Sequence, residues 1–218
     1  RSGKGTYIFA GQKKVTYSPG QSLYLTGNRY VGEWHNDKFE GSGSFKYSNG
    51  DTYEGEWKAD LRDGFGILVT TRGEHYEGEW KSNLKHGKGE FDFYNGDRYE
   101  GDWESDMMNG EGTYIYKSSG DIYSGSFKDG KKDGEGRYEF GGDQSQIVGT
   151  WVAGAITTGS WELKGAAVYT GAFKNGKPDG EGNFKFESGI EQGGSYVAKK
   201  EGEEDDEEAP VTITWEGT

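Results

Sequence analysis

The residue types that most often bind metals or act as nucleophiles are scarce in this chain. The sequence has no cysteine, which excludes disulfides, thiol nucleophiles and thiolate metal sites. Its three histidines, His35, His75 and His86, do not have the spacing of metal ligands. We interpret them as solvated side chains near strand ends or in loops, and we predict no metal site and no cofactor.

Carboxylates are abundant, but they recur with a fixed period. A catalytic pair of carboxyl groups needs one fixed distance between the two groups and has no reason to recur in every repeat. The periodic carboxylates therefore predict a charged outer surface and not an active site. The Gly-x-Gly pairs do not follow a strand and open a helix, so a phosphate-binding loop is unsupported. We therefore expect no catalytic residue and no enzymatic activity. The recurring carboxylates are Glu54, Glu56, Glu77, Glu79, Glu100 and Asp102.

The composition indicates a folded protein with a thin core. Hydrophobic residues make up 30% of the chain, yet 7 Trp, 15 Tyr and 11 Phe recur at regular intervals. The 40 glycines also fall at fixed positions within the repeat. The net charge of -13 disfavours nucleic acid and anionic membrane as partners, because both need a positive surface. No signal peptide or membrane-spanning apolar run is visible, and the chain has no Asn-x-Ser/Thr sequon, so we expect a cytoplasmic location.

The elements that position these side chains repeat about every 23 residues. Each unit opens on Tyr-x-Gly-x-Trp or a variant of it, and continues with Gly-x-Gly-x-aromatic. A fixed period of this length predicts a repeat architecture in which each unit contacts mainly its neighbours. The opening motifs begin at Tyr30, Tyr53, Tyr76, Tyr99, Tyr123, Ile147, Tyr169 and Gln192.

Each unit reads as a β-hairpin. Tyr53 and Trp57 alternate with Glu54 and Glu56, and a period of two predicts a strand with one apolar and one solvated face. The second strand begins near Gly64. Glycine on the aromatic face leaves room for a neighbouring ring to lie flat. The predicted fold is all-β: an elongated, single-layer, twisted antiparallel meander of hairpins of about 23 residues.

Two kinds of connection alternate along the chain. Asn49-Gly50-Asp51 and Asn95-Gly96-Asp97 link successive units, and Asn-Gly between alternating hydrophobics predicts a tight hairpin turn. Inside a unit, the segment from Lys58 to Asp63 is predicted to be a six-residue loop.

The expected organisation has four parts. Residues 201–208 hold seven acidic residues, which is typical of a solvated segment, with weak Ca²⁺ binding or a basic partner as the alternative. The parts are a degenerate repeat and a half at 1–29, the repeat array at 30–198 with its best copies at 30–120 and divergent ones at 144–198, an acidic linker at 199–210, and a C-terminal strand at 211–218.

One candidate interaction surface lies in the divergent repeats. Residues 144–161 carry no charge, although 29% of the chain is charged. Trp151, Val152, Ile156 and Trp161 gather there, and charge depletion with aromatic enrichment is typical of an interface core. The alternative is that a capping unit or a terminal tail of this chain covers the stretch.

A second candidate surface is a single strand. Its outward positions are Phe65, Ile67 and Val69, where the other units carry polar residues. An exposed apolar row predicts a docking patch for a protein partner. The alternative is partial cover by a bent neighbouring strand or a loop. An aromatic groove that binds a peptide or a carbohydrate is also conceivable, although rings stacked on one another explain the same pattern.

The repeating unit resembles the MORN repeat, with the best copies between Tyr30 and Gly120. Similar repeats occur in lipid-kinase regulatory segments, membrane tethers, a histone methyltransferase and ciliary scaffolds. The divergent end carries Val148-Gly149-Thr150-Trp151, Gly180-x-Gly182 and Glu191-Gln192-x-Gly194-x-Tyr196. It is similar to the MORN-only proteins of the radial spoke head in motile cilia, the family of radial spoke proteins 10 and 1.

This resemblance implies a non-enzymatic head subunit that assembles with other radial spoke head proteins and faces the central apparatus. The implied location is the axoneme of a cilium or flagellum, and no catalytic residue is carried over. A membrane or phosphoinositide tether and a regulatory domain of a larger enzyme are the alternatives. Whether two copies pair as a homodimer or heterodimer stays open.

Overall fold

A computed structural model describes residues 2–8, 14–18, 21–24, 27–200 and 211–217. Every regular element in this part of the chain is a β-strand, which confirms the predicted all-β class. The chain divides into two compact units, Arg1–Ser118 and Ser119–Thr218. The strands of the first unit are β1 (Gly3–Ile8), β2 (Lys14–Ser18), β3 (Gln21–Tyr24), β4 (Arg29–His35), β5 (Lys38–Lys46), β6 (Thr52–Lys58), β7 (Leu61–Val69), β8 (His75–Lys81), β9 (Leu84–Asp92), β10 (Arg98–Glu104) and β11 (Met107–Ile115).

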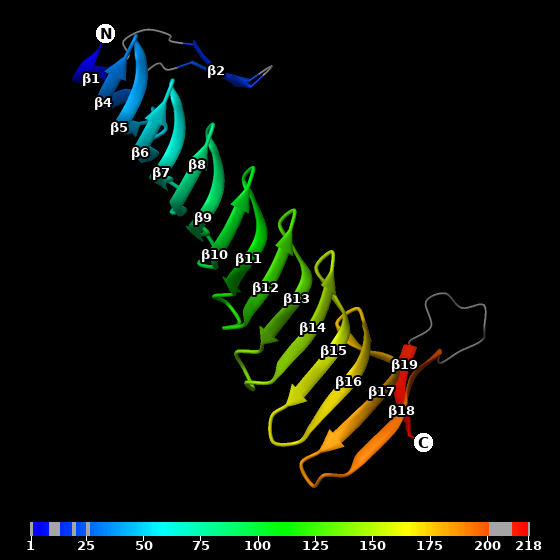
Figure 1. The fold of residues 1–218 in the computed structure, drawn as a ribbon. Coiled ribbons are helices and arrows are strands. Elements are labelled where there is room, and N and C mark those ends of the chain that lie inside the picture. The colour runs from blue at the N-terminus through cyan, green and yellow to red at the C-terminus, as the bar shows by residue number, and fades with distance from the viewer. Residues whose placement is uncertain (1, 9–13, 19–20, 25–26, 201–210, 218) are drawn as a thin grey trace. The chain divides into compact units, whose positions relative to one another are not determined.

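Strands β4 to β11 form an antiparallel meander in which each strand pairs with the next along the chain (Figure 1). β1 pairs with the free side of β4, and the glycines match in register, Gly5 opposite Gly32. β2 and β3 pair only with each other and form a separate hairpin. The segment predicted as a degenerate repeat therefore contributes β1 to the sheet of this unit and leaves β2 and β3 outside it.

The second unit repeats the same meander. Its last strand returns antiparallel to β18, with Trp215 opposite Tyr196. The acidic segment 201–208 lies outside the described residues. The strands of this unit are β12 (Ile122–Lys128), β13 (Lys131–Glu139), β14 (Gln146–Val152), β15 (Ala155–Leu163), β16 (Ala167–Lys174), β17 (Lys177–Phe186), β18 (Glu191–Lys200) and β19 (Val211–Gly217).

The two kinds of turn are the reverse of what the sequence predicts. The predicted six-residue loop is a two-residue turn, because Lys58 pairs with Leu61. Its central residues, Ala59 and Asp60, have φ values of 50° and 73°, and positive φ at both positions defines the tight type I′ turn. The Asn-Gly connection is the wider one and spans residues 47–51 between β5 and β6.

Hydrogen bonds between successive tight turns explain why these turns form without glycine. The Asp60 carboxylate accepts a 2.8 Å hydrogen bond from the backbone N–H of Phe39, which follows the preceding tight turn. Asn83 accepts from Arg62 at 2.8 Å, and Asp106 accepts from Lys85 at 2.8 Å, in the same way. Asp and Asn tolerate the left-handed conformation, and here that conformation aims the side chain at the neighbouring repeat.

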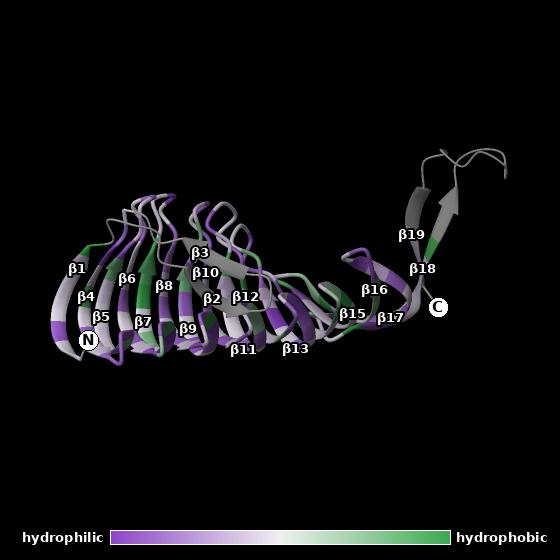
Figure 2. Cartoon of the chain, turned by 90° about the horizontal axis from the view of Figure 1, so that it is seen from above, coloured by the Kyte–Doolittle hydropathy of each residue, from purple (hydrophilic) through white to green (hydrophobic). Residues whose placement is uncertain are grey.

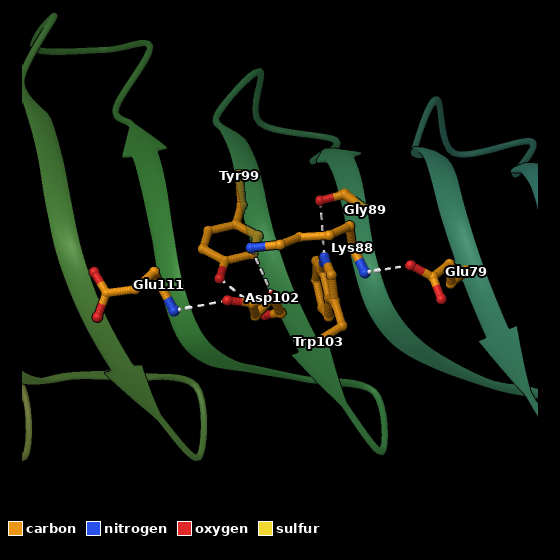
Figure 3. A network of polar contacts seen from close by, with 7 residues as sticks. All are labelled: Glu79, Lys88, Gly89, Tyr99, Asp102, Trp103 and Glu111. Atoms are coloured by element: carbon orange, nitrogen blue, oxygen red, sulfur yellow. Dashed lines mark hydrogen bonds and ion pairs between the residues drawn. The ribbon is translucent and has the colours of Figure 1, made fainter.

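The tyrosine of each unit lies flat over a pair of glycines. The Tyr99 ring covers Gly101 and Gly112, and a Cβ atom added at Gly112 would lie 2.4 Å from the Tyr99 hydroxyl. That hydroxyl donates a 2.9 Å hydrogen bond to the carbonyl oxygen of Asp102 (Figure 3). The predicted link between glycine and ring packing therefore holds in the six repeats that open on tyrosine. Tyrosines with no exposed surface occupy this position at Tyr30, Tyr53, Tyr76, Tyr99, Tyr123 and Tyr169.

Candidate docking surface on the outer face

The face opposite the buried rings, here called the outer face, carries the candidate site. β10 shows how this face is built. Asp102 lies between buried Tyr99 and Trp103, and its carboxylate accepts a 2.9 Å hydrogen bond from the N–H of Glu111 (Figure 3). Gly110, next to Glu111, has φ 96° and forms part of a β-bulge that only glycine enters easily. The carboxylate therefore satisfies a backbone group that the bulge removes from the ladder.

This arrangement repeats and gives several outer-face carboxylates a structural role. Glu79 accepts a 3.0 Å hydrogen bond from the N–H of Lys88, beside Gly87, whose φ is 56°. Glu56 accepts a 3.3 Å bond from the N–H of Phe65. The sequence pattern predicts a charged surface here. It does not reveal that the residue between Gly and Trp is held against the bulge of the next strand.

On β7 the outer face is apolar. Phe65 and Val69 expose 48% and 41% of their surface, and Ile67 between them is half-buried. These three residues are called the apolar row. Figure 2 shows β7 as a hydrophobic strand among strands of mixed or hydrophilic colour. The alternative that a neighbour covers the row is limited to Ile67, because both ends of the row are open.

Four glutamates border the apolar row. In the sheet register, Ile67 lies opposite Glu54 on β6 and Glu77 on β8, and Phe65 lies opposite Glu79. Glu54, Glu56, Glu77 and Glu79 are exposed, and none of them forms an ion pair within the described residues.

The neighbouring repeat balances its charges differently. Lys88 forms a 2.7 Å ion pair with Asp102 (Figure 3), and Arg98 pairs with Glu90 and Asp92. Lys88 and Glu90 occupy the positions that Phe65 and Ile67 hold one repeat earlier. The apolar row therefore replaces side chains that take part in ion pairs in the next repeat. The result is an apolar strip between two lines of glutamates that form no ion pair within the described residues.

The other predicted surface is largely core. Trp151 is 5% exposed and Ile156 is 2% exposed, so both pack inside their own unit and cannot contact a partner as predicted. Trp161 is half-buried and lies opposite Ile147 and Tyr169, on the ring-bearing face. Only Val152, 53% exposed, faces outward as an interface residue would.

The position of Ile156 explains part of the missing charge. It pairs with Trp151 across the hairpin, as Arg62 pairs with Trp57 and Lys85 with Trp80. The corresponding positions of the first unit carry Phe39, Arg62, Lys85 and Met108, so two of its four hairpins have a cation there. Ile156 places an aliphatic side chain at the same position, which accounts for one of the charges missing from 144–161.

The cations of the first unit fill the aromatic face. The Arg62 guanidinium lies 4.0 Å from the centre of the Trp80 ring, and the Lys85 ammonium lies 4.4 Å from that of Trp103. Burial lowers the pKa of Lys85, although the nearby Asp106 carboxylate acts in the opposite direction. Trp80 is 4% exposed, so its ring packs against its neighbours as the stacking interpretation predicts, and the cations among the rings are an addition that the sequence pattern does not reveal.

The histidines and carboxylates of the described residues are distributed over several strands. The histidines lie on β4, β8 and β9, and His75 Nδ1 is 4.0 Å from Asp92 Oδ2. Within the described residues, no group of three or more His, Asp or Glu side chains could hold a metal ion. No helix in that part of the chain is long and apolar enough to cross a membrane.

Antiparallel hairpins, most of them with a buried tyrosine over a glycine pair and a buried tryptophan or phenylalanine, define a β-hairpin repeat protein. The sequence profile of the MORN repeat matches more than half of the chain, which therefore belongs to the MORN repeat family. The divergent hairpin that begins at Ile147 falls between the last two matches. The matched segments are residues 30–52, 53–74, 76–98, 99–120, 123–142 and 169–190.

Among solved structures, the chain is similar to the TCP domain of SAS-4 (dCPAP) from Drosophila melanogaster, which was determined with a proline-rich motif of Ana2 (dSTIL). The two are 14% identical, with a TM-score of 0.44, and the similarity covers 70% of this chain and 83% of that one. No curated protein sequence gives a significant match.

Proposed function

We propose that this chain is a non-enzymatic structural subunit of the ciliary radial spoke head. In this role it binds other radial spoke head proteins and supports their contact with the central apparatus. The observation that carries the scaffold role is the apolar row of Phe65, Ile67 and Val69 between four exposed glutamates. The ciliary location rests on the resemblance of the divergent C-terminal repeats to MORN-only spoke-head proteins.

The chemistry of the row indicates what would bind there. Full burial of an exposed apolar side chain contributes about 1.5–3 kcal/mol. Because Phe65 and Val69 already bury about half of their surface, a partner would gain only part of this value from each of them, and the row can form the apolar centre of a small interface. Glu54 and Glu77 border the row on either side. A complementary partner would place apolar side chains on the row and lysine or arginine on both flanks, and the charges would favour that partner over an acidic one.

The bulge geometry supports a rigid docking site. The Glu56 carboxylate holds the N–H of Phe65, and Gly55 and Gly66 are paired across the same two strands. Phe65 therefore presents its ring from a backbone that is fixed on both sides. A site on rigid strands loses less conformational entropy when it binds than a site on a loop does.

The experiment introduces two positive charges into the row. Ile67→Lys/Val69→Lys should lower incorporation of the tagged chain into ciliary axonemes at least about tenfold, which corresponds to about 1.4 kcal/mol. The control is Ser42→Lys/Ser44→Lys, which adds the same charge at exposed outer-face positions of β5. Both variants should keep the β-sheet circular dichroism spectrum. Equal incorporation of the row variant and the wild type would contradict docking at the row.

A second role in the family, membrane attachment, predicts a different result. A membrane or phosphoinositide tether needs a positive surface, but acidic residues outnumber Lys and Arg by 38 to 25. Flotation with anionic liposomes at physiological salt separates the two roles. We expect the chain to remain in the unbound fraction, and co-flotation that high salt abolishes would support the tether.

A further inference from the structure

The last strand of the second unit supplies a ring that the last repeat lacks. In six repeats a tyrosine lies over the glycine two residues later, but Gln192 holds this position before Gly194. The Trp215 ring of β19 covers Gly194 instead, since a Cβ atom added at Gly194 would lie 2.5 Å from that ring. The Gln192 amide in turn lies against Gly217, where it would meet an added Cβ atom. Side chains of both strands therefore fix β19 on β18.

The Trp215 ring packs against rings of the two preceding strands. Its centre lies 5.1 Å from that of Phe184 on β17 and 5.1 Å from that of Tyr196 on β18. Seven consecutive residues of β19 pair with β18, beside which it lies in Figure 1. These contacts define what the edge of β18 accepts, which is an extended segment with an aromatic residue two positions before a glycine.

Two polar atoms of β19 are buried without a hydrogen bond. Trp215 Nε1 and Thr214 Oγ1 have no hydrogen-bond partner within the described residues. The indole of Trp103, by contrast, donates to the carbonyl oxygen of Gly89. A buried polar atom that loses its water without gaining a partner lowers stability. The contact between β19 and β18 is therefore weaker than one in which these two atoms are satisfied.

The connectivity of β19 also differs from that of the other strands in its unit. Within the described part of the chain β19 pairs with one strand, β18, whereas β13 to β18 each pair with two. In the sequence, ten residues separate β18 from β19, and two to six separate the other consecutive strands of this unit. Closing a longer connection costs more entropy. β19 is therefore the strand of this unit that an equivalent strand replaces most easily.

From these contacts we infer that the edge of β18 is a binding site for an extended strand of a partner protein, and that β19 occupies this site intramolecularly. The partner strand runs antiparallel to β18 and carries an aromatic residue two positions before a glycine. Valine or isoleucine directly before the aromatic residue takes the place of Thr214 and leaves no hydroxyl unsatisfied. Backbone hydrogen bonds provide affinity in such strand addition, and the side-chain contacts provide specificity.

This site goes beyond the proposed function, because β18 forms it and the apolar row takes no part in it. The row binds through side chains on an outer face, whereas the edge of β18 binds through its backbone. A failure of the Ile67→Lys/Val69→Lys experiment would therefore leave the strand-binding site standing, and the reverse also holds.

The test measures binding of a labelled peptide with the sequence of residues 211–217 to the full chain by fluorescence anisotropy. In the wild type, β19 competes with the peptide as an intramolecular strand. Trp215→Ala weakens this competitor and leaves β18 unchanged, so it should bind the peptide at least about tenfold more tightly than the wild type does. Ile190→Ala, which changes an exposed side chain before β18, should bind like the wild type. No binding to Trp215→Ala, or binding equal to the wild type, would overturn the inference.

Peptide variants test the two side-chain contacts, with the Trp215→Ala chain as the receptor. Alanine in place of the peptide's tryptophan should weaken binding at least about tenfold. Valine in place of the threonine before the tryptophan should strengthen binding, because it removes the unsatisfied hydroxyl. Gly194→Ala/Trp215→Ala should lose binding, since the new Cβ atom meets the incoming ring. Equal affinity for the tryptophan and alanine peptides would contradict the aromatic requirement, and a valine peptide that binds no better would contradict the role of the hydroxyl.

Two further measurements test replacement and the identity of the partner. In hydrogen exchange of the wild type, the backbone amides of β19 should exchange at least about tenfold faster than those of β15. Equal protection would contradict a replaceable strand. Size-exclusion chromatography with light scattering should show a wild-type chain that does not form dimers through β19. A dimer that Trp215→Ala abolishes would show exchange of β19 between two copies and would overturn the assignment to a partner protein.

Discussion

The indole Nε1–H of Trp103 donates a 3.1 Å hydrogen bond to the carbonyl oxygen of Gly89, on the last strand of the preceding repeat (Figure 3). Trp80 makes the same bond to Gly66 at 3.0 Å, and Trp57 to Gly43 at 3.1 Å. Each bond ties one repeat to its neighbour. In a repeat array, such nearest-neighbour terms account for much of the stability, because a single hairpin is marginal alone.

Trp103→Phe should therefore lower the free energy of unfolding by more than the smaller ring volume alone explains. The matched control is Trp151→Phe, because Trp151 is equally buried but its Nε1 has no hydrogen-bond partner. We expect Trp103→Phe to lower the free energy of unfolding by about 0.5–1.5 kcal/mol more than the control does. Urea unfolding followed by fluorescence measures both. Equal decreases in the two variants would show that the indole hydrogen bond does not contribute to the free energy of unfolding.

Gly112→Ala should destabilise the first unit through the Tyr99 ring. A Cβ atom at Gly112 would approach the Tyr99 hydroxyl to 2.4 Å. Overpacking of this kind costs about 1–3 kcal/mol. Gly142→Ala is the control, since a Cβ atom added there would meet nothing within 4 Å beyond its chain neighbours, and its φ is not left-handed. Chemical unfolding should show a loss for Gly112→Ala and almost none for the control. An unchanged free energy of unfolding in the Gly112→Ala variant would contradict the close packing of the Tyr99 ring on Gly112.

Asp97 should make stability depend on pH on the acid side. Burial acts to raise the pKa of this carboxyl, but hydrogen bonds from the Lys117 N–H, the Asn95 amide and the Tyr114 hydroxyl outweigh it and hold the pKa below its usual range. With a lowered folded-state pKa, the stabilisation is present above the ordinary pKa of about 3.9 and is lost as pH falls through the folded value.

Asp97→Asn tests this assignment, because it points an amide N–H₂ at groups that already donate. We expect a loss of about 1–3 kcal/mol at neutral pH. The difference in the free energy of unfolding between the variant and the wild type should become smaller below about pH 4, because the wild-type carboxyl is then protonated. Unfolding curves at a series of pH values measure this difference, and a difference that is constant with pH would rule out a role for the Asp97 charge.

The buried tyrosines should make stability fall in alkali. Burial raises the pKa of Tyr30, Tyr53, Tyr76 and Tyr99 well above its ordinary value. Above about pH 10 an unfolded tyrosine ionises while the folded one keeps its proton, so the folded state binds more protons and ΔG of unfolding decreases with pH. Lys85, whose pKa is lowered by burial, acts in the opposite direction.

Urea unfolding between pH 8 and pH 12 measures this effect. We expect a continuous decrease above about pH 10, since burial raises the pKa of seven tyrosines and lowers that of only two lysines, Lys85 and Lys132, within the described residues. Lys85→Met should make the decrease begin at lower pH, because it removes the opposing contribution. Met108 shows that methionine fits, since it holds the corresponding position in the next repeat. A flat pH profile would contradict the burial of the tyrosine hydroxyls.

The fold follows from the sequence because its signals recur. One Tyr-x-Gly-x-Trp motif is ambiguous, but Tyr53, Tyr76 and Tyr99 repeat it with one period, and alternation then assigns both faces of each strand. The predicted turn types are wrong because Ala59-Asp60 has no glycine to signal a tight turn, and the Asp60 side chain bonds to Phe39 in the preceding repeat, which lies 21 residues away in the sequence.

The candidate sites are less predictable. Ile156 is an apolar residue in an uncharged stretch, as an interface residue would be, but its place in the register puts it in the core. Phe65, Ile67 and Val69 can be found from the sequence, because alternation along one strand determines their face directly.

We propose that this chain is a scaffold of the radial spoke head, and mass spectrometry tests this role most directly. It identifies the proteins that the tagged full chain retains from salt-extracted ciliary axonemes, with a lysate of cells lacking cilia as the control. We expect recovery of other spoke-head subunits from axonemes only, with their loss in the Ile67→Lys/Val69→Lys variant. Recovery of membrane proteins or lipid-modifying enzymes, with no axonemal subunit, would contradict it.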